Sequence, residues 1–235
     1  MKKCIFVVNI KQGKMDFMSQ NQRDSFISAA ERWNVQYVEI EQFPKDLEWT
    51  YPCFIKLHWH NICDADRALI VDADAIIRAD APNPFEIFDD PRIFYAVHND
   101  WPYFHTVGYN PRDDLLIANT EINLINKVHP LDQTLDFQHI IENFFNAGVC
   151  LESREYHEEL LKYAWEISQD VPLGWWDQIP LNLAVYTMLG DYQEMGLTWN
   201  HRLPLNLDLM EGYIVHMAGD PSRYEMLKNV NWRNF

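Results

Sequence analysis

The sequence predicts an α/β fold in which helices flank a mostly parallel central sheet. Two observations predict this class. First, short apolar runs without polar alternation recur along the chain, as residues 68–71 illustrate, and such runs are typical of strands buried on both faces. Second, segments with apolar residues at helical spacing separate these runs, so strands and helices alternate.

The first strand, helix and second strand form a unit at the start of the chain. Residues 4–8 are an apolar run that stops at Asn9, and residues 4–10 are expected to form a strand. A helix is expected to begin near Ser19 or Asn21, either of which can cap it, and to end at Trp33. Residues 36–40 then form a second strand. Strand, helix and strand in this order favour a right-handed crossover connection between parallel strands.

The middle of the chain contains the most informative strand. A helix is expected over residues 52–62, because Pro52 suits the first turn of a helix. The buried strand 68–71 follows and ends abruptly in a pair of aspartates. The next elements expected are a turn at residues 82–85 and a strand at residues 93–97.

The second half of the chain begins with a region of weak periodicity. Residues 99–138 are rich in Asn, Asp, His and aromatic residues, so we expect an irregular region that contains a short helix or a hairpin. The elements expected after it are a helix at 133–143, a strand at 144–151, helices at 154–168 and 177–189, strands at 196–199 and 213–217, and a tail of loop and short helix from 221. No repeat or linker interrupts the pattern, so residues 1–235 are expected to form one domain.

Composition and charge exclude several classes of function. The chain has 235 residues, 48% of them hydrophobic, which is enough to bury a core. Its formal net charge of −16 argues against a nucleic-acid partner or an anionic membrane surface, since both require basic patches. No apolar stretch reaches transmembrane length, and the first one ends at Asn9 without a small-residue cleavage site after it. We therefore expect a cytoplasmic protein whose four cysteines, which lack metal-binding spacing, are free thiols.

The aspartates that end the buried strand are the first candidate site. Asp72 and Asp74 are expected at the carboxyl end of the strand, where open α/β sheets bind ligands. Their spacing directs both side chains to one face if the strand continues. Because two unpaired carboxylates are costly to bury, we expect a divalent cation that bridges protein and phosphate oxygens. The same tripeptide at residues 64–66 precedes the strand, and there we expect solvated or capping aspartates, with Asp66 paired to Arg67.

Two histidines, His58 and His60, suggest a second metal site. Residues two apart on a helix face different directions, however, so the two imidazoles are not expected to share a zinc ion. We interpret both as ordinary structural histidines.

Five motifs in a fixed order resemble a known family. They are Ile70-Val71-Asp72-Ala73-Asp74, Phe145-Asn146-Ala147-Gly148-Val149, Asp177-Gln178 with Leu181-Asn182, Trp199-Asn200, and Ile214-Val215-His216-Met217-Ala218-Gly219. In this order they resemble the GT-A fold nucleotide-sugar glycosyltransferases, above all glycosyltransferase family 8, the glycogenin and lipopolysaccharide galactosyltransferase type. A short acidic motif alone is common, but five ordered motifs are specific. The likeness covers nearly the whole chain and is weakest at residues 99–138, which it places on the acceptor side.

The resemblance implies that Asp72, Asp74 and His216 bind one divalent cation. His216 lies in a late apolar run near Gly219, where the backbone can approach a ligand closely. A lone histidine in an apolar run is commonly a core residue, but alongside the acidic pair we favour a metal ligand. Two carboxylates and an imidazole suit Mn²⁺ better than the harder Mg²⁺, which is the alternative.

The resemblance also implies contacts with a nucleotide-sugar donor. The residues at the matching positions are Val8, Asn9, Lys56, Asp72, Ala73, Asn146, Gly148, Gly219 and Arg223. Gly148 would weaken a strand unless something must come close, which supports a site there. Three assignments have ordinary alternatives: Asn9 as a turn residue, Lys56 as a solvated lysine and Arg223 as a solvated arginine of the tail. Arg223 follows Ser222, where the family usually has a phosphate-binding lysine, and a guanidinium can take over that contact.

Asp177 and Gln178 match the family's Asp-Gln pair, which holds sugar hydroxyls near the anomeric carbon, so the resemblance implies a catalytic position for both. The alternative for Asp177 is to cap the following helix, and one residue can do both. Trp175 and Trp176 can form a wall for a sugar or belong to the core.

The resemblance therefore predicts a metal-dependent glycosyltransferase that moves a sugar from a nucleotide-diphosphate donor, a UDP-sugar, to a hydroxyl of a carbohydrate or other acceptor, with retention of configuration. Two alternatives stay open. A sugar-phosphate nucleotidyltransferase shares the fold, but such enzymes carry a Gly-rich basic loop after the first strand, and residues 11–14 contain a single glycine. A non-catalytic sugar-nucleotide-binding module is the other alternative, although every expected acidic ligand is present.

Overall fold

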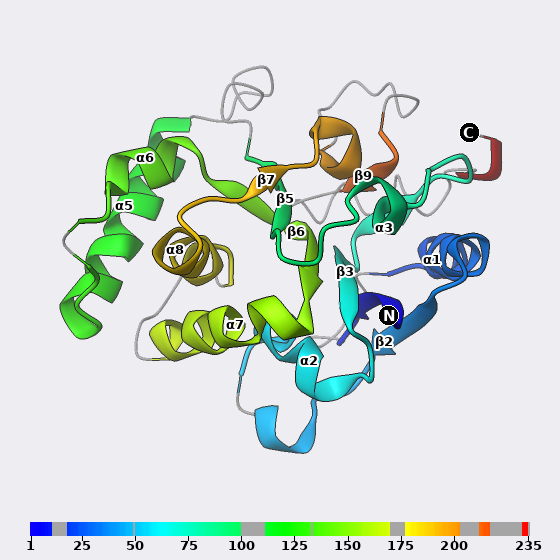
Figure 1. Ribbon diagram of the computed structural model, residues 1–235, viewed down its shortest axis with the longest axis horizontal. Helices are drawn as coiled ribbons and strands as arrows, with labels where there is room; N and C mark the ends of the chain where they lie inside the picture. The colour runs from blue at the N-terminus through cyan, green and yellow to red at the C-terminus, as the bar shows by residue number, and fades with distance from the viewer. Residues whose placement is uncertain are drawn as a thin grey trace.

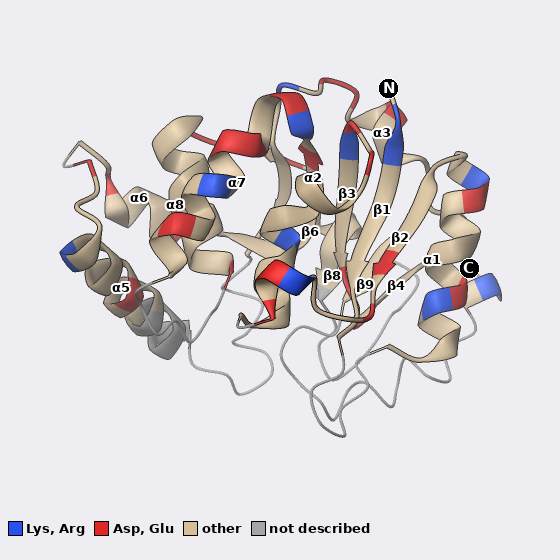
Figure 2. Ribbon diagram, turned by 90° about the horizontal axis from the view of Figure 1, so that it is seen from below, with Lys and Arg blue, Asp and Glu red and all other residues tan. Residues whose placement is uncertain are grey.

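The computed structural model describes residues 1–10, 18–48, 50–99, 111–132, 134–169, 177–202, 212–216 and 232–234. Within these ranges a six-stranded sheet runs through the molecule and has helices on both sides (Figures 1 and 2). Its strands lie in the order β2 (Gln36–Ile40), β1 (Lys3–Val8), β3 (Arg67–Asp72), β6 (Phe145–Ser153), β5 (Tyr95–His98) and β7 (Gln193–Glu194). Five strands run in one direction and β6 runs in the other, which confirms the expected mostly parallel α/β sheet.

A second, three-stranded sheet extends the first beyond the end of β3. Its order is β4 (Ala75–Ile77), β9 (Ile214–His216) and β8 (His201–Arg202). β4 begins after a two-residue turn that follows β3, and it pairs antiparallel with β9. A strand from near the end of the sequence therefore lies beside the carboxyl end of β3.

The first crossover unit forms as the sequence predicts. Helix α1 (Gln20–Trp33) begins at Ser19, whose hydroxyl accepts from the backbone N–H of Gln22 while the Gln22 side chain accepts from the backbone N–H of Ser19. This reciprocal pair is a capping box, and it selects Ser19 over Asn21 as the cap. The strands on either side of α1 pair in parallel.

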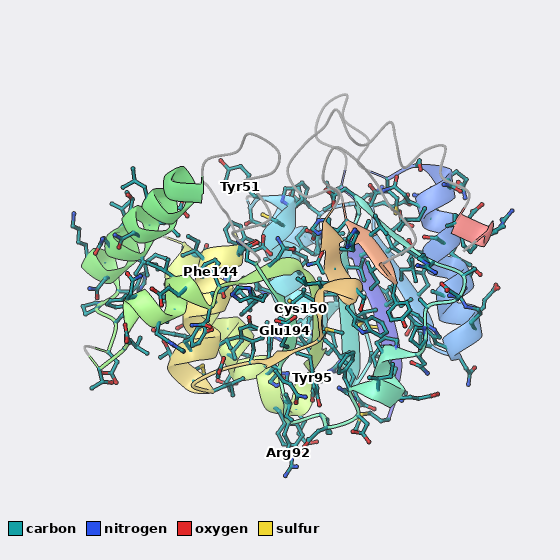
Figure 3. All side chains as sticks on the ribbon, turned by 90° about the horizontal axis from the view of Figure 1, so that it is seen from above. Tyr51, Arg92, Tyr95, Phe144, Cys150 and Glu194 are labelled. Atoms are coloured by element: carbon teal, nitrogen blue, oxygen red, sulfur yellow. The ribbon has the colours of Figure 1, made fainter. Side chains whose placement is uncertain are left out.

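Two hydrophobic cores cover the two faces of the sheet. Alternate residues of β1 point to opposite cores: Cys4 and Phe6 pack with α7 (Arg154–Ser168) and α8 (Gln178–Met188), whereas Ile5 and Val7 pack with α1. The same alternation holds along β3 and β6, so these strands are buried on both faces, and their unbroken apolar runs follow from this. Cys150 of β6 and Glu194 of β7 flank β5 in the middle of Figure 3.

The remaining helices complete the two layers. They are α2 (Trp59–Ile62), α3 (Pro84–Ile87), α5 (Pro111–Val128), α6 (Phe137–Glu142) and 3₁₀ turns at Lys45–Leu47, Pro52–His58, Leu197–Asn200 and Trp232–Asn234. Among the described residues, each helix is too short or too polar to cross a lipid bilayer. The four cysteines are free thiols, as expected.

Three expectations about elements are wrong. Residues 111–128 lie within the region expected to be irregular but form the long helix α5. The expected strand at 196–199 is instead a 3₁₀ turn, because Gly196 adopts a positive φ of 89° that turns the chain. The expected turn at 82–85 contains the start of α3, capped by Asn83. The expected helix at 52–62 forms with these bounds, as a 3₁₀ helix over Pro52–His58 that continues into α2.

Candidate active site

The candidate site lies at the carboxyl end of β3. Asp72 is the last residue of this strand, but Asp74 lies in the turn between β3 and β4, so the expectation of a continuing strand that directs both side chains to one face is wrong. Helix α1 holds this turn in place, because the Gln22 side chain donates to the carbonyl oxygens of Ala73 at 3.0 Å and Ala75 at 3.3 Å. The structure therefore gives Ala73 a backbone role at the turn.

His216 reaches the two aspartates through the second sheet. The register of β4 and β9 sets Ala75 opposite His216. His216 Nε2 lies 3.2 Å from Asp74 Oδ1 and 3.5 Å from Asp72 Oδ2, and one ligand atom of each of the three residues lies within 4.8 Å of the others. Two carboxylates and a buried imidazole at this spacing fit a divalent cation that accepts both oxygen and nitrogen ligands, such as Mn²⁺.

Two further charged residues, Lys56 and Asp177, lie next to the aspartates. Lys56 Nζ is 2.7 Å from Asp72 Oδ1 and 2.9 Å from Asp177 Oδ2, and it donates to the carbonyl oxygen of Ala147 at 3.2 Å. Burial alone would lower the pKa of the Lys56 amine, but the two carboxylates outweigh it and raise that pKa well above its usual range. The alternative of a solvated lysine is therefore wrong, since Lys56 is a buried cation between two acids.

Asp177 immediately precedes α8. Its backbone is already helical and its side chain makes no capping hydrogen bond, so the alternative of a helix cap is wrong. Burial raises the pKa of the Asp177 carboxyl, and the Lys56 amine opposes this without cancelling it. Lys56 is thus the charge partner that makes a buried acid tolerable at this position.

Asn146 and Gln178 are joined side chain to side chain. The Asn146 Nδ2 group donates to Gln178 Oε1 at 3.1 Å, and Asn146 Oδ1 accepts from the backbone N–H of Gly148 at 2.9 Å. Gly148 lies against His216, so the group that requires a glycine in β6 is the protein's own imidazole. A close approach does occur at Gly148, but the imidazole makes it, and the expected contact of Gly148 with a donor stays a prediction.

Asn200 is a site residue that the sequence-based assignment did not include. Its Nδ2 group donates to Asn146 Oδ1 at 2.8 Å, and its Oδ1 lies 2.9 Å from His216 Nδ1. The signal was present in the sequence, because Asn200 belongs to one of the five ordered motifs. Only the structure shows that it contacts the imidazole.

The carboxyl end of β1 forms the other side of the site. Val8 is paired with both Ile40 and Asp72, which places it one strand away from the aspartates. Asn9 is buried, and its Nδ2 group donates to Glu39 Oε1 at 2.9 Å. Asn9 Oδ1 is buried and has no hydrogen-bond partner among the described residues. A turn role alone does not explain this arrangement.

Some expected residues lie elsewhere or outside the described ranges. Gly219, Arg223, Trp175 and Trp176 fall outside the described residues. In the earlier acidic tripeptide, Asp64 pairs with Lys2, and Asp66 accepts from the Lys2 backbone N–H. The expected pair of Asp66 with Arg67 is wrong, because the Arg67 guanidinium donates to the carbonyl oxygens of Phe88 and Asp89.

His58 and His60, which were expected to face different directions, do not do so. The rings of His58 and His60 stack with their centroids 6.4 Å apart. Among the described residues, the one group of three side chains with metal-ligand spacing is Asp72, Asp74 and His216.

Comparison with known structures identifies the fold. No protein-family model matches the sequence, and no curated protein is significantly similar to it. Solved structures of glycosyltransferases do match over nearly the whole chain, so the fold is the GT-A fold that the five motifs predicted.

Three of the matching structures, each with a TM-score above 0.5, illustrate the similarity. A glycosyltransferase involved in the glycosylation of the major capsid of PBCV-1 matches with a TM-score of 0.59 and 14% identity, over 98% of this chain and 100% of that one. The bifunctional glycosyltransferase WbbM matches with a TM-score of 0.57 and 12% identity, over 99% of this chain and 50% of the WbbM chain. The glycosyltransferase GlyE of Streptococcus pneumoniae TIGR4 matches with a TM-score of 0.55 and 11% identity, over 99% of this chain and 61% of the GlyE chain. At these identities the similarity establishes the fold alone.

Proposed function

We propose that this chain is a metal-dependent glycosyltransferase of the family 8 type, which transfers a sugar from a UDP-sugar to a hydroxyl of a carbohydrate or other acceptor with retention of configuration. The observation that carries the proposal is the convergence of Asp72, Asp74 and His216 at the end of β3. Asp72 ends a strand of the first sheet, Asp74 lies in the turn that follows, and His216 comes from the second sheet and a distant part of the sequence. A fold shared with glycosyltransferases supports the same function.

Asp72, Asp74 and His216 would bind the cation, and Mn²⁺ suits their donor atoms. A divalent cation bound there supplies Lewis-acid stabilisation of the departing diphosphate. The chain itself supplies the arrangement, because the Gln22 side chain fixes the turn that carries Asp74 and the pairing of β4 with β9 fixes His216.

Val8 and Asn9 are positioned to hold the nucleoside. Val8 is the last residue of β1 and Asn9 follows it, at the carboxyl edge of the parallel strands where such sheets usually bind ligands. Asn9 Oδ1 is a buried acceptor that uracil or ribose could satisfy with an N–H or O–H group. Gly219 and Arg223 are proposed, from the motif alone, to contact the diphosphate.

Lys56, Asp177 and Gln178 would bind and orient the sugar. Lys56 keeps Asp72 and Asp177 close together by placing one cation between them. Asp177 and Gln178 stand at the first turn of α8, where their side chains can bind sugar hydroxyls.

Neither residue is set up as a covalent nucleophile. Asp177 is paired with Lys56, and Gln178 Oε1 already accepts from Asn146. We therefore favour attack by the acceptor hydroxyl on the face from which the diphosphate departs. In that route the leaving phosphate oxygen takes the proton of the acceptor.

The test is release of UDP. Purified protein is incubated with a panel of UDP-sugars in Mn²⁺ or in EDTA, and free UDP is measured with and without simple sugar acceptors. We expect slow, Mn²⁺-dependent release from one or a few donors. Binding without release would identify a binding module, and activity only with a sugar phosphate and a nucleoside triphosphate would identify a nucleotidyltransferase.

A further inference from the structure

Three side-chain amides and one imidazole are hydrogen-bonded in series across the site. His216 Nδ1 lies 2.9 Å from Asn200 Oδ1, Asn200 Nδ2 lies 2.8 Å from Asn146 Oδ1, and Asn146 Nδ2 lies 3.1 Å from Gln178 Oε1. Asn146 and Asn200 are both buried. The series connects a candidate metal ligand at one end with a candidate catalytic side chain at the other.

One backbone group fixes the direction of the whole series. The N–H of Gly148 points at Asn146 from 2.9 Å, and a backbone N–H can only donate. The Asn146 atom that faces it must therefore be the oxygen. The other end of the same amide, its NH₂ group, must then face Gln178, which has to present Oε1 as the acceptor.

The same constraint runs in the other direction to the imidazole. Because Asn146 presents its oxygen to Asn200 as well, Asn200 must donate its NH₂ group there. Asn200 then has only its own oxygen left for His216, and this oxygen accepts. The proton must be on Nδ1 of His216, so Nε2 is the nitrogen that faces Asp74 and Asp72.

We propose that Asn200 and Asn146 are positioning residues that set the metal-binding tautomer of His216 and the orientation of the Gln178 amide together. The proton on Nδ1 leaves the Nε2 lone pair for the cation, and the same series turns the Gln178 NH₂ group away from Asn146, toward a substrate hydroxyl. The inference rests on the proposed function for the roles of these two end groups.

Two substitutions at position 200 separate the contact of Asn200 with His216 from its contact with Asn146. Asn200→Asp keeps an oxygen acceptor for His216 Nδ1 but cannot donate to Asn146. Asn200→Leu has a similar volume and does neither. The Mn²⁺ affinity, measured by electron paramagnetic resonance, should be at least that of the wild type in Asn200→Asp and should fall by about 10–100-fold in Asn200→Leu.

The rate of UDP release should depend on the contact of Asn200 with Asn146, which leads to Gln178. Both variants remove one of the two donors that hold Asn146 Oδ1 and leave only the Gly148 N–H. The Asn146 amide, and with it the Gln178 amide, is then held less firmly, so kcat should fall by about 10–100-fold in both variants, including the Asp variant that still binds Mn²⁺. Asn182→Leu is the matched control for Mn²⁺ affinity, because Asn182 is also a buried asparagine but bonds to the backbone of Phe145 and Gln178 instead of to the imidazole. Its Mn²⁺ affinity should match that of the wild type in whatever fraction folds, as judged by circular dichroism.

Equal Mn²⁺ affinity in Asn200→Leu and wild type would overturn the proposal, and so would an equal loss in Asn200→Asp and Asn200→Leu. A metal-free measurement keeps the test independent of the proposed function. In ¹⁵N NMR spectra at alkaline pH, Nδ1 of His216 should carry a proton, and an imidazole protonated only on Nε2 would refute the tautomer. If the wild type released no UDP, the proposed function would be refuted, but the NMR spectrum would still test whether the hydrogen-bonded series sets the tautomer of His216.

Discussion

The imidazole of His216 occupies the space in which a side chain at position 148 would lie. A Cβ placed on Gly148 would meet His216 Cε1 at 2.1 Å and Nδ1 at 2.7 Å, far inside ordinary contact distances. All nine residues of β6 are buried, and glycine weakens a strand there. Position 148 therefore requires a glycine, because the imidazole of His216 lies too close to its Cα for any side chain.

Gly148→Ala should displace the imidazole from the aspartates. Mn²⁺ affinity should fall by about tenfold or more, and crowding should lower the free energy of unfolding by about 1–3 kcal/mol. Titration of Mn²⁺ and urea unfolding measure the two effects. The double variant Gly148→Ala/His216→Ala is the control, because removing the ring should return most of the lost stability. An alanine variant that bound Mn²⁺ like the wild type would contradict this account of the site.

Asp74→Asn should abolish Mn²⁺-dependent binding of UDP and leave the fold intact. The amide keeps the shape of the side chain but offers the cation no charge. Asp64→Asn is the matched control, since Asp64 belongs to the same tripeptide sequence but lies exposed beside Lys2. Isothermal titration with UDP in Mn²⁺ should separate the two variants. Tight Mn²⁺-UDP binding by Asp74→Asn would rule out the assigned metal site.

Local patterns explain which elements could be predicted. α7 has the expected bounds, because its apolar stripe is regular and its neighbours are clear. In α5, Ala118, Ile122 and Ile125 are buried at helical spacing, but the polar residues between them hid the pattern. The 3₁₀ turn at 197–200 depends on the conformation of Gly196, which no periodicity reveals.

Only part of the candidate site could be predicted from the sequence. Asp72 and Asp74 were expected from their place at the end of a buried strand, and His216 from the ordered motifs, and the structure brings these three side chains together. The ion pair of Lys56 with Asp177 joins residues far apart in the sequence, and nothing near either residue indicates the other. The contact of Asn200 with His216 likewise depends on how the 3₁₀ turn and β9 pack together.

Lys56→Met should destabilise the protein strongly at neutral pH. It leaves the buried carboxylate of Asp177 and the partly exposed carboxylate of Asp72 without their cation, and breaking such a pair typically costs about 3–5 kcal/mol. Urea unfolding in EDTA measures the loss. The double variant Lys56→Met/Asp177→Asn should regain part of it, because one of the stranded charges is gone. A single variant within about 1 kcal/mol of the wild type would show that the pair contributes little.

Glu152 is a buried carboxyl on β6 outside the proposed metal site. The indole N–H of Trp59 donates to its Oε2 at 2.6 Å. Burial raises the pKa of Glu152 from 4.5 to about 8, and the Trp59 hydrogen bond and the Lys56 charge oppose this only in part. In the folded protein the carboxyl is therefore neutral over a pH range in which the unfolded chain is ionised.

Glu152→Gln should remove a pH dependence of stability. The neutral carboxyl contributes stability that is fully present below pH 4.5, falls as the unfolded chain ionises, and is lost once the pH passes about 8. The glutamine never ionises and can still accept from Trp59. Urea unfolding across this interval should therefore show the variant gaining on the wild type by several kcal/mol as the pH rises, since one pKa unit corresponds to about 1.4 kcal/mol. A difference that stayed constant with pH would mean that Glu152 ionises normally in the folded protein.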